Sequence, residues 1–80
     1  MPAKIHLPSH LMDERQLIGS RIRRLRAERR WTQEQLAERC GLDRQTISRA
    51  ETSTRGLPID VYLLIANALG VPLWRLFRDD

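Results

Sequence analysis

The sequence predicts an all-α domain of five helices. Apolar residues recur at spacings of three, four and seven, and no segment alternates apolar and polar residues as a half-buried strand does. Glycines, prolines and residues that cap helices separate these periodic segments. With 80 residues, the chain is long enough for one compact domain. We expect an irregular amino-terminal arm over residues 1–12 and a single domain over residues 13–80.

The composition excludes several classes of protein. A single cysteine, Cys40, rules out an intramolecular disulfide framework and a Cys-rich zinc site. Gly70 and Arg75 interrupt the most hydrophobic region, which falls short of the roughly 20 apolar residues that cross a bilayer. The first twenty residues lack the long apolar run of a secretion signal. The sequence therefore predicts a soluble, cytoplasmic protein.

The first helix is expected over residues 14–29, with Ile18, Ile22 and Leu25 on its apolar stripe. Residues 15–49 carry ten arginines against four acidic residues, which gives this segment a net charge of +6. A basic block of this kind is typical of a protein that binds a polyanion. A solvated helix face is the alternative interpretation of the same charges.

Local signals mark the second and third helices. Thr32 and Gln35 have the spacing of a capping box, so the second helix starts after Thr32 and ends at Gly41. Asp43 is expected to cap a third helix over residues 44–51. Two short helices joined by so tight a turn form a helix-turn-helix, whose second member can enter the major groove of DNA.

The fourth and fifth helices follow a short turn. The fourth is expected from near Pro58 to Leu69, with Gly70 as its end. Pro72 begins a last short helix that runs through Phe77. The fourth helix is apolar nearly all round, which predicts that it is covered on more than one side. The face expected in the core consists of Ile59, Tyr62, Ile65, Ala66 and Leu69.

We expect a homodimer interface on a second apolar stripe of the fourth helix, with a contribution from the last helix. This predicted dimer surface consists of Val61, Leu64, Ala68 and Trp74. In the alternative interpretation, apolar residues of the arm cover the stripe within one chain. These arm residues are Ile5, Leu7 and Leu11.

Four motifs follow one another along the chain. They are Ile18-Gly19-Ser20-Arg21-Ile22-Arg23-Arg24-Leu25-Arg26, Thr32-Gln33-Glu34-Gln35-Leu36-Ala37, Gly41-Leu42-Asp43-Arg44 with Ile47-Ser48 and Glu51, and Ile65-Ala66-Asn67-Ala68-Leu69-Gly70-Val71. With these motifs in this order, the sequence resembles the phage-repressor and Cro-type helix-turn-helix family, or XRE family, over residues 17–77. The resemblance implies a lambda-repressor-like fold that binds operator DNA, usually as a dimer, with the third helix reading the bases.

The resemblance also implies roles for individual residues. Base contacts are expected from the outward face of the third helix, at Arg44, Gln45, Ser48 and Arg49. Phosphate contacts are expected from Thr32, Gln33, Thr46 and Arg55. Gln suits adenine and Arg suits guanine, and each bidentate contact is worth about 1–3 kcal/mol of discrimination. Ordinary surface arginines are the alternative for Arg44 and Arg49.

Two further positions concern the stability of this arrangement. In the family, the positions of Arg26 and Glu51 form a charge pair that links the first helix to the end of the third. Two solvated side chains are the alternative.

The family often has glycine where this chain has Arg30, so we expect the turn between the first two helices to be built differently.

The sequence therefore predicts a sequence-specific transcriptional regulator that binds two-fold symmetric DNA as a homodimer and joins the nucleoid when bound. It is similar to the controller proteins of restriction-modification systems in Leu42-Asp43-Arg44 and Arg55-Gly56-Leu57. A phage or plasmid repressor, an antitoxin-type regulator with a protein partner, and a protein-interaction module remain alternatives.

No enzyme activity, cofactor or membrane is expected. Pro8 lies between His6 and His10 and opposes the helix that would aim both rings at one metal, so no metal site is expected either. Cys40 is expected to be a small core residue.

Overall fold

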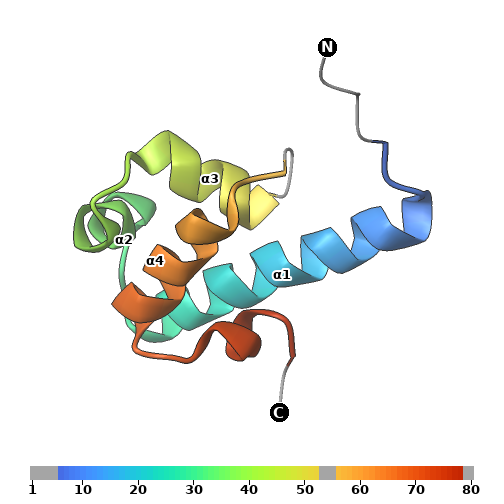
Figure 1. The fold of residues 1–80 in the computed structure, drawn as a ribbon. Helices are drawn as coiled ribbons and strands as arrows, with labels where there is room; N and C mark the ends of the chain where they lie inside the picture. The colour runs from blue at the N-terminus through green and yellow to red at the C-terminus, as the bar shows by residue number, and fades with distance from the viewer. Residues whose placement is uncertain (1–5, 53–55, 79–80) are drawn as a thin grey trace.

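The computed structural model describes residues 6–52 and 56–78, in which four α-helices are followed by one 3-10 turn (Figure 1). The helices are α1 (Ser9–Glu28), α2 (Gln33–Cys40), α3 (Arg44–Thr52) and α4 (Ile59–Leu69), and the turn is η1 (Leu73–Leu76). The all-α prediction is confirmed, but the predicted fifth helix is only this turn. Its hydrogen bonds reach back three residues, from the Phe77 N–H to the Trp74 carbonyl at 2.9 Å, as a 3-10 turn requires.

Helix α1 is longer than predicted. It begins at Ser9, because the carbonyl of Pro8 accepts hydrogen bonds from the N–H groups of Leu11 (3.0 Å) and Met12 (3.1 Å). The expectation of an irregular arm up to residue 12 is wrong from Ser9 onward. These first turns project beyond the other helices in Figure 1 and leave Leu11 and Met12 exposed. Without a core to face, the segment shows little of the periodicity that predicts a helix.

One hydrophobic core holds the elements together. Every α-helix and η1 contributes buried side chains, so each element gains stability by packing against the others. The buried apolar residues are Ile22, Leu25, Leu36, Ala37, Cys40, Ile47, Ala50, Ile65, Ala66, Leu69 and Leu76. Burial raises the pKa of the Cys40 thiol, which therefore stays protonated as a core residue.

The predicted helix ends are confirmed where local hydrogen bonds define them. The Thr32 hydroxyl accepts from the Gln35 N–H at 3.1 Å, and the Gln35 side chain accepts from the Thr32 N–H at 2.8 Å. Gly41 (φ 71°) and Gly70 (φ 74°) end α2 and α4 in the left-handed conformation.

The turn between α1 and α2 is not built differently from one that contains glycine. Arg30 has φ 57°, which is the left-handed conformation that glycine adopts most readily. The Arg30 N–H donates to the Ala27 carbonyl at 2.9 Å, and its side chain is exposed. The chain therefore makes this turn with arginine in a backbone conformation that side chains disfavour.

Helices α1 and α3 come into close contact at Gly19. A Cβ atom at this position would lie 2.3 Å from the carbonyl oxygen of Glu51 and 2.8 Å from that of Ala50. Both neighbours are backbone atoms of α3, so neither can turn aside as a side chain would. The small residues Gly19 and Ala50 let the two helix backbones approach each other.

We expect Gly19→Ala to lower the free energy of unfolding by at least about 1 kcal/mol. Overpacking costs about 1–3 kcal/mol, and a contact of 2.3 Å with a backbone atom belongs at the upper end of that range. The better helix propensity of Ala returns no more than about 1 kcal/mol, so a net loss remains. Urea unfolding of the variant measures the loss. Gly56→Ala is the matched control, because the nearest atom to its added Cβ is a side-chain nitrogen of Arg15 at 3.7 Å. Equal stability of the two variants would contradict the proposed close approach.

Helix α4 differs from its predicted faces. Ile65, Ala66 and Leu69 are buried as expected, and Tyr62 is half-buried. Ile59, which was expected in the core, is 55% exposed. It is the first residue of α4 and lies at the end of the helix furthest from the buried residues of the later turns. The helical period alone does not indicate where along its axis a helix leaves the core.

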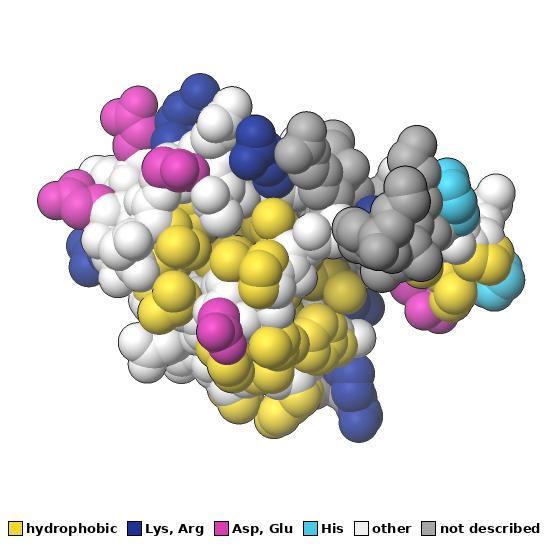
Figure 2. Space-filling view, turned by 45° about the horizontal axis from the view of Figure 1, so that its top comes forward, with side chains coloured by type: hydrophobic (Ala, Val, Ile, Leu, Met, Phe, Trp, Pro, Cys, Tyr) yellow, Lys and Arg dark blue, Asp and Glu magenta, His cyan; other side chains and the backbone are white. Residues whose placement is uncertain are grey.

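The second apolar stripe of α4 is only partly exposed. Val61 and Ala68 are half-buried and pack against the core, whereas Leu64 is 41% exposed. The neighbouring Leu63 and the more distant Trp74 are also exposed. Hydrophobic side chains accordingly gather over the centre and lower part of the surface in Figure 2.

The arm residues that the structure describes line a different surface from the second apolar stripe of α4. Leu7 and Leu11 line a hollow of about 410 Å³ together with Ile59 and Tyr62. Ile5 lies outside the described residues. The arm residues that the structure describes therefore face the start of α4 rather than Leu64.

Candidate nucleic-acid interface

The turn between α2 and α3 is fixed by hydrogen bonds at both ends. The Leu42 N–H donates to the Ala37 carbonyl at 2.9 Å, and the Thr46 N–H donates to the Asp43 carboxylate at 2.6 Å. Two hydrogen bonds lower the pKa of Asp43 below its ordinary value. The larger effect comes from the side chain of Thr46, and the smaller from its backbone N–H. Asp43 is therefore an ionised cap at the start of α3, as predicted.

Helix α3 has one buried face and one polar face. Ile47, Ala50 and Glu51 are buried. The other side chains are exposed or half-exposed and carry hydrogen-bonding groups. These are Arg44, Gln45, Thr46, Ser48, Arg49 and Thr52. The four residues predicted to contact bases thus belong to one short helix whose apolar side is anchored in the core.

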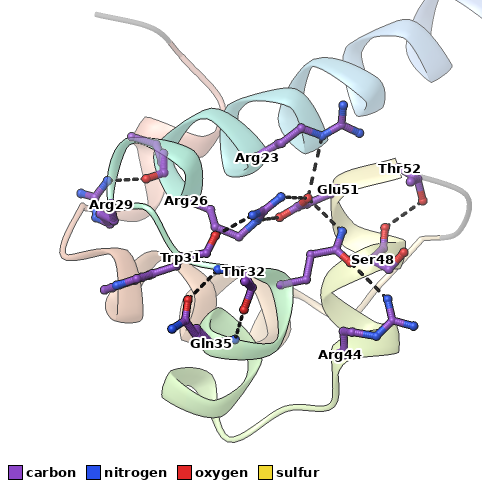
Figure 3. Close-up of polar contacts among 12 residues, drawn as sticks. Arg23, Arg26, Arg29, Trp31, Thr32, Gln35, Arg44, Ser48, Glu51 and Thr52 are labelled. Carbon is purple, nitrogen blue, oxygen red and sulfur yellow. Dashed lines mark hydrogen bonds and ion pairs between the residues drawn. The ribbon is translucent and has the colours of Figure 1, made fainter.

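Glu51 is a buried charge on the inner face of this helix. Its carboxylate accepts from Arg26 twice, from Nε at 2.6 Å and from Nη2 at 3.0 Å (Figure 3). Arg26 also donates from Nη1 to the Trp31 carbonyl at 2.6 Å. The Glu51 side chain is 0% exposed and that of Arg26 is 16% exposed. Arg26 therefore ties α3 to α1 and to the turn that precedes α2.

The contact with Glu51 favours the charged form of the Arg26 guanidinium. The hydrogen bond from Arg26 to Glu51 raises the pKa of the guanidinium, and the opposite charge of Glu51 raises it further, against the opposing effect of burial. Because the contact is bidentate, it fixes orientation as well as charge. The pair sets the position of α3 relative to α1.

Gln33 extends this cluster to the start of α3. Its Nε2 donates to Glu51 Oε1 at 3.1 Å, and its Oε1 accepts from Arg44 Nη1 at 3.3 Å. The sequence predicted a phosphate contact for Gln33 and indicated neither of these hydrogen bonds. The residues are 18 and 11 positions apart, so no local spacing in the sequence indicates them.

Arg23 also belongs to this cluster and was not singled out by the sequence. Its Nε lies 3.8 Å from Glu51 Oε1, and its side chain is 60% exposed. Arg26, Gln33 and Arg44 further line a shallow hollow of about 470 Å³ with Thr32 and Glu34. The arrangement is a polar surface with exposed positive charge on both sides of a buried carboxylate.

Four of the predicted site residues lie apart from this cluster, and a fifth is not described. Arg55 falls outside the described residues. Residues Val61, Leu64, Ala68 and Trp74 belong to α4 and η1 rather than to the helix-turn-helix. Over residues 6–52 and 56–78, no three His, Cys, Asp or Glu side chains are grouped so that they could hold a metal ion. None of the helices in those ranges has the length and apolar content needed to span a membrane.

Known proteins share both the sequence and this geometry. The sequence model of the helix-turn-helix family matches residues 22–73, which include α2, α3 and α4. The chain belongs to the helix-turn-helix family, in its XRE type. It is a transcriptional regulator with a helix-turn-helix DNA-binding domain.

Two relatives extend this likeness over most of the chain. A hypothetical transcription factor from Neisseria meningitidis is 35% identical over 79 residues, which are 95% of this chain and 74% of the relative. The uncharacterised HTH-type transcriptional regulator y4dJ from Sinorhizobium fredii is 40% identical over 60 residues, or 75% of this chain and 78% of the relative.

A solved structure shows the same fold in a protein of known setting. The restriction-modification controller protein C.AhdI from Aeromonas hydrophila is 34% identical, with a TM-score of 0.75. The superposition covers 81% of this chain and 97% of the controller protein.

Proposed function

We propose that this helix-turn-helix protein is a sequence-specific regulator that binds a two-fold symmetric operator as a homodimer, with α3 in the major groove. The observation that carries the proposal is the division of α3 into an anchored apolar face and an exposed face of hydrogen-bonding side chains. A helix of this kind can present side chains to base edges while the core holds its orientation. Likeness to C.AhdI supports restriction-modification control as the setting.

In this proposal, the base contacts come from two successive turns of α3. Arg44 and Gln45 lie in the first turn, and Ser48 and Arg49 lie one turn later. Arginine forks match the two acceptors of guanine, and the glutamine amide matches adenine. The Arg44 guanidinium donates to Gln33 at 3.3 Å, which links the first turn of α3 to the start of α2.

The phosphate contacts come from the margins of the helix-turn-helix. Thr32 and Gln33 lie at the amino-terminal end of α2, where the helix dipole favours an anion. Asp43 accepts from the Thr46 N–H at 2.6 Å and also hydrogen-bonds the Thr46 hydroxyl, so Thr46 is assigned to a phosphate from the sequence resemblance. Arg55 is assigned to a phosphate from the sequence resemblance alone.

The homodimer uses the apolar surface of α4 and η1. Its exposed centre is Leu64, together with Trp74 of η1, which is 48% exposed. The half-buried Val61 and Ala68 lie at its edges. An isologous interface places the same patch on both subunits and relates the two reading helices by a two-fold axis. The half-site centres should then lie roughly 34 Å apart, about one turn of DNA.

Variants of the reading helix test the proposed roles. Arg44→Ala or Arg49→Ala should relax the preference at one position of each half-site by about 1–3 kcal/mol, because each removes a base contact. Binding to operators selected from a random duplex library, and to their single-base variants, measures this. Arg30→Ala, an exposed arginine outside α3, is the control. A uniform loss across the panel would show that α3 does not read the sequence.

Salt dependence separates DNA binding from the alternative of a protein-interaction module. Binding of the wild-type protein to random duplex should weaken with salt, with a slope of about −0.9 in log affinity for each phosphate neutralised. A slope near zero would refute DNA as the partner and favour a protein ligand.

A further inference from the structure

Arg23 is a second arginine of α1 that approaches Glu51, besides Arg26. It lies one turn before Arg26 on α1, and its Nε is 3.8 Å from Glu51 Oε1. Yet its side chain is 60% exposed, whereas the carboxylate it approaches is fully buried. Arg23 therefore reaches from the surface toward a charge inside the domain, and its guanidinium lies at the edge of the polar surface.

The carboxylate does not require Arg23 for its own stability. Arg26 already balances its charge with two hydrogen bonds of 2.6 and 3.0 Å and is itself largely buried. A single long contact to an exposed arginine contributes little in comparison. The cluster of Arg23, Arg26 and Glu51 consequently carries one surplus positive charge, and it lies on the exposed guanidinium.

The surplus charge is next to the proposed phosphate contact. Arg23 Nε and Gln33 Nε2 approach the same oxygen, Glu51 Oε1, at 3.8 and 3.1 Å. Figure 3 shows the dashed contacts running from Arg23 through Glu51 toward Arg44 at the start of α3. A phosphodiester held at the amino-terminal end of α2 would thus lie within reach of the guanidinium fork, whose geometry suits phosphate.

We propose that Arg23 of α1 is a further DNA-binding residue, which contacts the phosphate backbone beside Gln33 and extends the interface from the helix-turn-helix onto α1. The inference rests on the proposed function, since its ligand is the DNA that α3 reads. It adds a cation to a margin that Thr32 and Gln33 otherwise supply only with neutral groups. Backbone contacts of this kind fix register without reading sequence.

The test compares the full-length wild-type protein with Arg23→Gln on random duplex and on selected operators at several salt concentrations. Loss of one neutralised phosphate per subunit should reduce the steepness of the salt slope by about 0.9 for each subunit bound, which is about a fivefold loss of affinity per subunit near 0.15 M salt. The loss should be the same for every base change in the panel. Arg23→Lys should restore most of the slope, because it keeps the charge.

A purely structural role would give a different result. If Arg23 only supported Glu51, Arg23→Gln would shift the urea midpoint, and Arg23→Lys would not restore affinity selectively at low salt. Arg30→Gln removes an exposed charge from the turn that follows the same helix and should leave the slope unchanged. An unchanged slope in Arg23→Gln, with normal wild-type binding, would overturn the assignment to Arg23. Absence of salt-dependent binding in the wild type would instead overturn the proposed function.

Discussion

Arg26→Met and Glu51→Leu should each lower the free energy of unfolding by about 3–5 kcal/mol, because each leaves the other charge without its partner in a desolvated site. The effect is large for Glu51 variants in particular, since its side chain is 0% exposed and serves three donors besides the long contact to Arg23. The double variant should lose much less than the sum of the single losses, because two apolar side chains of similar volume need no compensating charge.

Urea unfolding of both single variants and of the double variant measures this coupling. Arg23→Met is the matched control, because it removes an exposed arginine that lies 3.8 Å from the same carboxylate. It should cost less than about 1 kcal/mol, as exposed ion pairs do. Small, additive losses for Arg26 and Glu51 would show that the pair does not hold α3 in place.

Leu64→Arg should convert a folded dimer into a folded monomer and reduce operator affinity by about 10²–10⁴-fold, because the two half-sites are then no longer bound by linked subunits. Leu64 is 41% exposed, so an arginine at this position can remain in solvent in the monomer. Burial of the charge in a two-fold interface would be costly. Sedimentation at micromolar concentration and operator titration measure the two effects.

Leu17→Arg is the control for this experiment, because Leu17 is 53% exposed on α1 and outside the proposed interface. It should leave both the dimer and operator affinity intact. A monomeric wild-type protein would refute the proposed surface on α4 and η1. So would a Leu64→Arg variant that unfolds, since Leu64 would then belong to the interior of the domain.

The sequence predicted the two ends of α2, the start of α3 and the end of α4 well, because their causes are local. The bonds between Thr32 and Gln35 span three residues, and so does the bond from Thr46 to Asp43. Gly41 ends α2 by a backbone conformation that few other residues adopt readily. Such features depend on residues within one helical turn, so the local sequence is sufficient to predict where these helices begin and end.

The errors occurred where a helix meets or leaves the core. The first turns of α1 pack little of their surface, so the pattern that identifies a helix is weak from Ser9 to residue 12. Ile59 continues the apolar period of α4 but lies at an exposed end. Arg30 adopts a conformation typical of glycine because the short connection to α2 requires it. In each case the surrounding helices, rather than the local residues, decide the outcome.

By itself, the sequence determined the succession of helices, their caps, the basic segment and the residue types available for binding DNA. Only the tertiary structure decided that Gly19 sits against the α3 backbone and that Gln33 links Glu51 to Arg44. It also decided that Arg23 approaches Glu51 in addition to Arg26. The physical reason is that helical periodicity fixes which face a side chain occupies, whereas contacts between helices depend on how closely and at what angle those faces pack.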